Sequence, residues 1–181
     1  LQVTSGTWTV VNTGKYDMTA YTAHATSVLY ITGTNFFAVC NSNGYLSKLD
    51  ASIAGFNPTG NNGGFAFWSL AYLPGTNNFL AASPLRVVSY TTMTVSKTTT
   101  TLPSTILKYL TCVNATNCVA ADTSANFKVY DINAANFLGA TDTLVGKSIG
   151  VGVCSGIAGF TSSNYYVVCN QSYCYFRIFG N

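Results

Sequence analysis

Four copies of one short pattern constrain the fold of this chain more than any other feature. Each copy centres on an asparagine that follows a threonine or serine, and these anchors are Asn35, Asn77, Asn117 and Asn164. One apolar run precedes each anchor, a second follows it, and a third comes a few residues later. The anchors are about 40 to 47 residues apart, a spacing typical of propeller blades and other repeat arrays.

The two ends of the sequence add a further constraint. The fourth copy ends at its third apolar run, whereas an additional strand-like segment, residues 7–11, belongs to no copy. A ring explains both observations if the N-terminal strand completes the last blade, because closure removes exposed sheet edges. The sequence therefore predicts a single all-β domain, residues 1–181, folded as a four-bladed β-propeller closed by the N-terminal strand.

The run Phe127-Lys128-Val129-Tyr130-Asp131 resembles the third strand of a WD-type propeller blade. The resemblance is architectural and implies a propeller repeat rather than a specific family, since the Gly-His and Trp-Asp signatures of WD repeats are absent. The alternatives are a β-sandwich, which does not explain a shared anchor, and a trefoil-like barrel, which needs three repeats. No segment sustains apolar residues at helical spacing.

Charge excludes some classes of partner. Only 7% of the residues are charged, and the formal net charge of +3 is scattered along the chain without a basic cluster. Nucleic acid is therefore not an expected partner, because its recognition needs clustered lysine and arginine. The apolar runs have the length of strands, so we expect no membrane-spanning segment and no membrane partner.

Six cysteines without neighbouring histidines favour disulfides and an extracellular location. The spacing favours a bond between Cys112 and Cys118, and then one between Cys154 and either Cys169 or Cys174. Cys169 and Cys174 also flank one tight turn, and Cys169 cannot pair with both Cys154 and Cys174. If the blades close into a ring, Cys40 could pair with whichever of Cys154 and Cys174 is left. The alternative is that several cysteines are buried free thiols. Two sequons, at Asn114 and Asn170, are candidate glycosylation sites.

Candidates for catalysis are few. His24 is the only histidine, and no nucleophile elbow accompanies it, so we interpret it as a loop residue. Asp17 and Asp142 are the one acidic pair whose repeat positions place them on the same face, where a secreted hydrolase could use them. The sequence shows no metal-binding motif. We therefore expect no catalytic residues, no metal and no cofactor.

Non-catalytic binding fits the composition better. The loops expected on one face of the propeller carry aromatic side chains beside many asparagines, and the candidate ligand-binding residues are Tyr16, Tyr21, Tyr45, Phe65, Phe67 and Trp68. Aromatic planes and amides suit neutral glycans, so the first hypothesis is a secreted, lectin-like glycan-binding protein. Against it, these aromatics do not recur at equivalent repeat positions, and Phe65, Phe67 and Trp68 also fit packing between blades.

The second hypothesis is an extracellular structural subunit. A surface with few charges lowers the repulsion between copies and permits close association. Such a protein would build filaments, matrix or adhesive structures by binding copies of itself or other extracellular protein surfaces.

Overall fold

The computed structural model describes residues 2–4, 7–9, 24–50, 59–62, 66–82, 85–98, 106–124, 128–133, 146–149, 152–160 and 163–180. This part of the chain consists of β-strands joined by turns and contains no helix. The strands pair antiparallel in five sheets. The predicted all-β fold class is confirmed. Within the same residues, no helix has the length and hydrophobicity needed to cross a bilayer.

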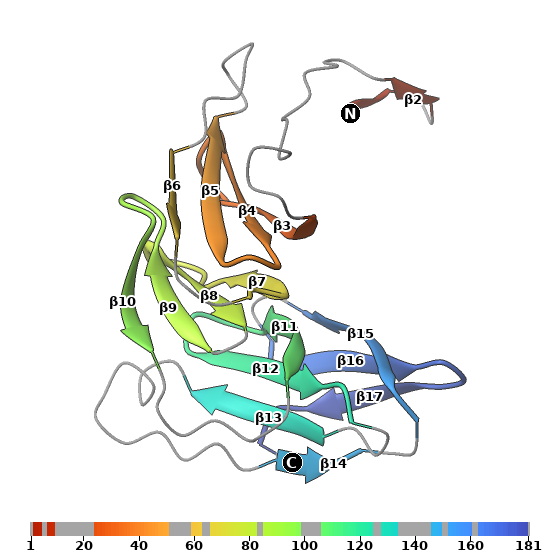
Figure 1. Cartoon of the computed structure of the whole chain (residues 1–181). Coiled ribbons are helices and arrows are strands. Elements are labelled where there is room, and N and C mark those ends of the chain that lie inside the picture. The colour runs from red at the N-terminus through yellow and green to blue at the C-terminus, as the bar shows by residue number, and fades with distance from the viewer. Residues whose placement is uncertain are drawn as a thin grey trace.

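Each of the four sequence repeats forms one sheet, and the strands follow one another across it in chain order (Figure 1). The first sheet contains β3 (Ala25–Tyr30), β4 (Phe36–Asn41), β5 (Tyr45–Asp50) and β6 (Thr59–Asn62). The second contains β7 (Ser69–Tyr72), β8 (Asn78–Ala82), β9 (Arg86–Ser89) and β10 (Thr94–Thr98). The third contains β11 (Leu107–Cys112), β12 (Asn117–Asp122), β13 (Lys128–Asn133) and β14 (Gly146–Ser148). The fourth contains β15 (Cys154–Gly159), β16 (Tyr165–Asn170) and β17 (Cys174–Ile178).

The first strands of the four sheets lie next to one another in chain order. β3 contacts β7, β7 contacts β11, and β11 contacts β15. Side-chain hydroxyls link two of these three strand pairs. Between β3 and β7, the Ser27 hydroxyl accepts a hydrogen bond from the Leu70 backbone N–H (3.3 Å), and between β11 and β15, the Thr111 hydroxyl accepts one from the Gly159 N–H (2.9 Å). At Gly159 a side chain would not fit, because its Cβ would lie 2.9 Å from the Cys112 carbonyl oxygen. The sheets therefore form a closely packed series.

Interior sheets bury both faces, because a neighbour covers each one. On β8, Phe79 packs in the core between the first and second sheets, whereas Leu80 packs in the core between the second and third. On β12, Ala120 and Val119 divide in the same way between the cores on either side of the third sheet. This explains why the second strands read as continuous apolar runs instead of alternating patterns.

A hydroxyl group shapes the first turn of three repeats. The Thr76 hydroxyl donates to the Leu73 carbonyl (2.9 Å) and accepts the Asn78 N–H (3.1 Å). Thr34 and Ser163 make the same pair of contacts in the first and fourth sheets. Side-chain hydroxyls stabilise tight turns in this way. The residue before each anchor, rather than the anchor itself, therefore determines the local geometry of these turns.

A buried asparagine or aspartate closes the turn between the second and third strands of three sheets. Asn41, Asp122 and Asn170 end β4, β12 and β16 and are 0%, 1% and 8% exposed. In each case one side-chain oxygen accepts two backbone N–H groups of the turn. A buried acceptor at this position satisfies N–H groups that would otherwise lose their hydrogen bonds to water.

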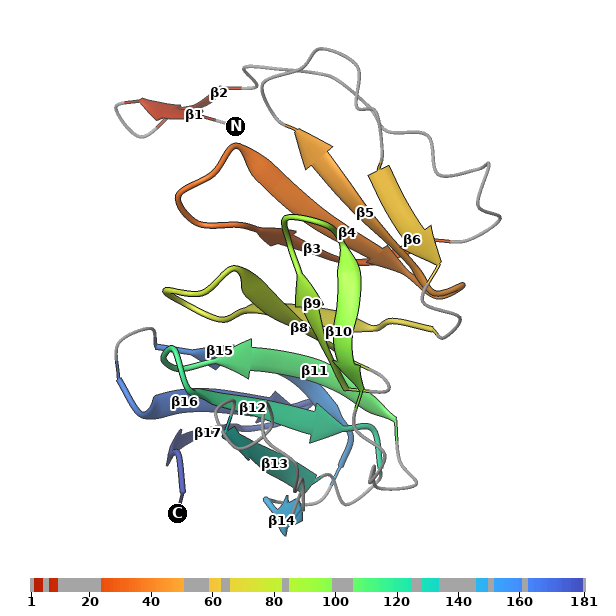
Figure 2. The ribbon, with the colours of Figure 1, turned by 90° about the vertical axis from the view of Figure 1, so that its left-hand side faces the viewer.

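The N-terminal strand does not complete the last sheet in this structure. β2 (Thr7–Thr9) pairs with β1 (Gln2–Thr4) in a two-stranded sheet, and the fourth sheet has three strands within the described residues. Figures 1 and 2 both place this hairpin beyond the first sheet, at the end of the molecule away from β17. Closure by residues 7–11 within one chain is therefore not confirmed, because the strand expected at β17 is paired elsewhere.

Asp122 makes the stability of the fold sensitive to acid. Burial by itself would raise the pKa of its carboxyl group, but hydrogen bonds from Ser124, the Lys128 backbone and Tyr130 outweigh burial and hold the pKa below its usual value. Because the pKa is lower in the folded state, the stabilisation is complete above the unfolded-state pKa of about 4 and is lost as the pH falls through the folded-state pKa.

We expect Asp122→Asn to reduce the free energy of unfolding at pH 7 by about 1–3 kcal/mol, since hydrogen bonds to a buried carboxylate are replaced by weaker ones to a neutral amide. Urea unfolding at pH 7 and at pH 3 measures the change, and the variant should lose less stability than the wild type on acidification. Asp131→Asn is the matched control: its carboxylate is half-buried and bonds Lys147 at 3.2 Å. Equal acid sensitivity of the wild type and Asp122→Asn would contradict the prediction.

Candidate functional site

The first strands of the first three sheets surround a hollow of about 350 Å³. It is lined by Thr26, Ser27, Trp68, Ser69, Lys108 and Tyr109. The Lys108 ammonium lies 5.5 Å from the centre of a Trp68 ring, and both side chains are half-buried. An aromatic face, a cation and several hydroxyls meet here, which is a combination able to hold a small polar ligand.

A second hollow, of about 240 Å³, lies along the first strands of the first, second, third and fourth sheets. Tyr30, Tyr72, Cys112 and Gly159 line it, and each of them stands five residues before its repeat anchor. The Tyr30 and Tyr72 hydroxyls donate to the carbonyls of Thr34 and Thr76 in the turns that follow. Repeat-equivalent residues from all four sheets thus meet at one place, as they do around the axis of a propeller.

The structure places three of the six predicted ligand-binding residues, and it does not bring them together. Trp68 lines the larger hollow, whereas Tyr45 is a half-buried residue at the start of β5, opposite Asn62. Phe67 is fully buried between the first and second sheets, where the Arg86 guanidinium lies 5.6 Å from its ring. It has no surface on which a sugar could stack. Tyr16, Tyr21 and Phe65 lie outside the described residues.

Sequence reasoning missed Lys108 and Tyr109. They lie on the first strand of the third sheet, far in sequence from Trp68, and the sequence contains no signal that joins them. The acidic pair Asp17 and Asp142 lies outside the described residues, and His24 is exposed. Within the described part of the chain, no three His, Cys, Asp or Glu side chains group closely enough to hold a metal ion.

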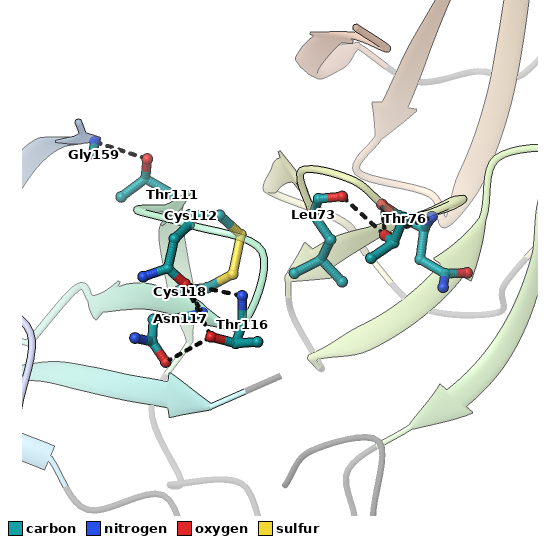
Figure 3. The surroundings of a disulfide bond; sticks show 10 residues. Leu73, Thr76, Thr111, Cys112, Thr116, Asn117, Cys118 and Gly159 are labelled. Carbon is teal, nitrogen blue, oxygen red and sulfur yellow. Dashed lines mark hydrogen bonds between the residues drawn. A yellow bond between two sulfur atoms is a disulfide. The ribbon is translucent and has the colours of Figure 1, made fainter. Parts of the chain in front are cut away.

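Two hairpins carry disulfides. Cys112 and Cys118 face each other across β11 and β12 and are bonded, as predicted (Figure 3). The second bond joins Cys169 and Cys174 across β16 and β17. The predicted pairing of Cys154 with Cys169 or Cys174 is therefore wrong, and so is the pairing expected for Cys40. Both Cys40 and Cys154 are buried free thiols.

The burial of the free thiols explains this outcome. Cys40 packs in the core between the first and second sheets, and Cys154 packs in the core between the third and fourth. Cys169 and Cys174 lie opposite each other on the face of the fourth sheet that points away from the third. The spacing of the cysteines along the chain does not reveal which face of the sheet Cys154 occupies, because a β-bulge interrupts β15 next to it.

The side chains of both sequon asparagines are engaged in turns. The Asn114 oxygen accepts the backbone N–H groups of Thr116 and Asn117, and its nitrogen donates to Asn164 at 2.8 Å. Asn170 is 8% exposed, and its oxygen accepts two N–H groups at 2.8 and 2.6 Å. Glycosylation at either position stays a prediction.

The fourth sheet presents an apolar outer face. Tyr165 pairs with Ile178, and Val167 pairs with Phe176, so these four side chains share one face with Ala158 and Phe160. Phe176 is 61% exposed and Phe160 is 52% exposed, and the Phe176 ring lies 5.2 Å from that of Tyr165. The opposite face carries Tyr166 and Val168, which are buried against the third sheet.

The first sheet has a corresponding outer face at the other end of the series. Val28 pairs with Val39 and Tyr30 pairs with Phe37, so these four side chains share a face. Val28 is 65% exposed and Tyr30 is 48% exposed, whereas Val39 on the same face is 6% exposed and is already covered within the chain. Among the described strand residues, neither outer face carries a charged side chain. The contiguous exposed apolar surface of the fourth sheet is of the kind that marks interaction sites in folded proteins.

Comparisons with known proteins identify the fold and no family. No protein-family model and no curated protein matches the sequence. Among solved structures, the β-propeller domain of Cps50 (Swd1) from Myceliophteria thermophila is similar with a TM-score of 0.66 and 10% identity. That match covers 87% of this chain and 55% of the propeller domain, so the chain spans about half of its length. The computationally designed Ika4 protein is similar with a TM-score of 0.60 and 11% identity, over 87% of this chain and 92% of Ika4.

The chain therefore has a β-propeller-like fold. Its antiparallel sheets and its similarity to a propeller domain agree on this point. Identity of 10% is too low to carry any function from that domain to this chain.

The free thiols provide a test of the cysteine assignment. Burial raises the pKa of the Cys40 thiol to about 11 and also raises that of Cys154. We expect both thiols to react slowly with a thiol-specific reagent at pH 8, because little thiolate forms and access is blocked. Denaturation without reductant should release two reactive thiols per chain. Four or six thiols, or a peptide map that joins Cys154 to Cys169 or Cys174, would contradict the assignment.

Proposed function

We propose that this protein is an extracellular, non-catalytic structural subunit that binds copies of itself through the apolar outer face of its fourth sheet. The observation that carries the proposal is the exposed cluster of Phe160, Tyr165 and Phe176, with neighbouring apolar residues and no charge. An isolated soluble domain seldom leaves such a face in water, because burying apolar area stabilises a complex by about 25 cal/mol per Å².

Two further features support an extracellular role. Two disulfides clamp hairpins, and bonds of this kind persist mainly in oxidising environments. The scarcity of charge removes the repulsion that keeps most soluble proteins apart. A chain with these properties suits filaments, matrix or adhesive layers at a cell surface.

We also infer that the four sheets are four blades of a propeller and that β2 is the strand that completes the fourth blade. The meeting of repeat-equivalent residues at the second hollow supports this inference. So does the strand count: the first three sheets have four strands, and the fourth has three within the described residues.

The association is tested with Phe176→Arg. Because Phe176 is 61% exposed, the substitution should leave the fold intact, while it places an unpaired charge in the proposed contact. We expect the wild type to form complexes larger than one chain at micromolar concentration in analytical ultracentrifugation. The variant should remain a monomer, with an apparent dissociation constant at least tenfold higher.

Ile106→Arg is the matched control, since Ile106 is 49% exposed and lies outside both outer faces. It should associate as the wild type does, and circular dichroism should show the same strand content in all three proteins. A wild type that stays monomeric at 100 µM would overturn the proposed function.

A second candidate function is lectin-like binding of neutral glycans at the larger hollow. The observation that favours it is the placement of Trp68 beside Lys108, with the Thr26, Ser27 and Ser69 side chains around them. A sugar ring stacks on an aromatic plane while its hydroxyls bond neighbouring polar groups. The hollow lies on the first strands, away from the outer face of the fourth sheet, so the two functions are compatible.

We expect Trp68→Ala to abolish binding on a glycan array if this second function exists, because the stacking surface is lost. Tyr173→Ala is the control, since Tyr173 is an exposed aromatic residue on the turn before β17, outside the hollow. Equal glycan binding by the wild type and Trp68→Ala, or no binding by the wild type, would contradict this function.

A further inference from the structure

We propose that the larger hollow binds an anionic sugar residue, one that carries a carboxylate or a sulfate group, and that Lys108 binds its charge. The proposal rests on the second candidate function, glycan binding at this hollow, and is independent of self-association. It differs from that function in the class of ligand, because the hollow would select charged sugars over neutral ones.

An irregularity in the strand pairing recurs at one repeat position of the first strands. The residues at this position stand nine residues before their anchors and are Thr26, Trp68, Lys108 and Ser155. In the first, third and fourth sheets the register with the second strand shifts across this residue, so Thr26, Lys108 and Ser155 are bulged. In the second sheet, the Trp68 N–H donates to the carbonyl of Ala82, the residue that pairs with Ser69. A bulge changes the direction in which a side chain points.

Three of these four repeat-equivalent residues line the larger hollow. Thr26, Trp68 and Lys108 bring a hydroxyl, an indole and an ammonium group to one place. In the fourth sheet, the Ser155 hydroxyl instead donates to the carbonyls of Cys169 and Asn170 in its own sheet. Packing gives no reason for such different side chains at one repeated position, whereas a binding site needs different groups around one ligand.

Hydrogen bonds between the first and second sheets hold one wall of the hollow in place. The Thr26 hydroxyl donates to the Phe67 carbonyl at 2.6 Å, which fixes the backbone beside Trp68. The Ser27 hydroxyl accepts the Leu70 N–H at 3.3 Å, next to Ser69. A wall that is already ordered reduces the entropy lost when a ligand binds.

Among the described residues that line the hollow, Lys108 is the charged one. No carboxylate stands among them, and Lys108 forms no ion pair within the part of the chain that the structure describes. The carboxylate of Asp122 accepts hydrogen bonds from its own turn, and that of Asp131 pairs with Lys147. A half-buried ammonium without a carboxylate beside it favours an anionic ligand. Because an ammonium is a compact charge with three donors, it can bind a carboxylate or a sulfate.

Trp68 and the size of the hollow favour a sugar ring as the carrier of this charge. The Lys108 ammonium lies 5.5 Å from the centre of a Trp68 ring, so a ligand that bonds Lys108 has the indole beside it. A sugar ring offers an apolar face to the indole and hydroxyls to Ser27 and Ser69. The volume of about 350 Å³ is near the lower end of the range for ligand pockets, about 300–1,000 Å³. It therefore suits one or two sugar rings.

The experiment compares three probes that differ in charge: methyl glucuronide, glucose 6-sulfate and methyl glucoside. Ligand-observed NMR titration measures the affinity of each. We expect one or both anionic probes to bind at least about tenfold more tightly than methyl glucoside, since a hydrogen bond to a charged group contributes about that factor. The anionic probe that binds more tightly shows whether the hollow prefers a carboxylate or a sulfate.

Substitutions of Lys108 test its role directly. Lys108→Met keeps the aliphatic stem and removes the charge, so the affinity for the anionic probes should fall to that for methyl glucoside. Lys108→Arg keeps the charge and should retain the preference for anionic probes. Added NaCl should weaken binding of the anionic probes to the wild type, because salt screens the attraction.

Lys48→Met is the matched control. Lys48 is also half-buried, and its ammonium lies 3.7 Å from the centre of the Phe36 ring, but it is on β5 and outside the hollow. This variant should bind all three probes as the wild type does. Circular dichroism should show the same strand content in every variant.

The outcomes separate this proposal from glycan binding in general. Absence of binding to the anionic probes, together with no binding on a glycan array, would overturn both. Equal affinity for neutral and anionic probes, or unchanged binding of the anionic probes by Lys108→Met, would overturn the anionic ligand and leave glycan binding standing. An equal loss in Lys48→Met and Lys108→Met would also overturn it, because the net charge of the protein would then explain the preference.

Discussion

The packing of one sheet face on the next is the interaction on which the rest of this structure depends. Each interior sheet has apolar side chains on both faces, as Phe79 and Leu80 show on adjacent positions of one strand. Such a sheet is stable only between two neighbours, because an uncovered apolar face stays in water. The same requirement applies at the two ends of the series, where Val28 and Phe176 are exposed. The proposed self-association follows from this requirement.

Polar groups serve this packing by holding each hairpin in shape. The hydroxyl of Thr76 and the carboxylate of Asp122 satisfy backbone N–H groups at turns where the strands reverse. In the first turn of the third repeat, the hydroxyl and the backbone N–H of Thr116 both donate to the Asn114 side chain, which is a different set of contacts from the other three repeats. The disulfide between Cys112 and Cys118 holds this turn. These local bonds fix where each strand ends, and therefore which side chains reach the cores between sheets. Because the chain has few charged residues, neutral hydrogen bonds and the buried carboxylate of Asp122 hold these turns.

The sequence predicted the elements of the fold well and the site poorly. Strand order and the bond between Cys112 and Cys118 follow from short-range periodicity, and both are present. The other cysteine pairing failed because a bulge near Cys154 changes which face of the sheet it occupies. Phe67 was predicted at a binding surface, but it is buried, since an aromatic residue just before a strand packs equally well between sheets. The hollow beside Trp68 depends on contacts between segments distant in the sequence, which no local pattern records.

The sequence by itself determined four repeats, their strands and the residues that shape their turns, because these depend on interactions between residues close along the chain. The tertiary structure decided which apolar faces are covered and which are left exposed, and it placed β2 away from β17. Those outcomes depend on how successive sheets are oriented around one another, a property to which every contact between sheets contributes. For this reason the exposed outer faces, and the association proposed from them, became visible only in three dimensions.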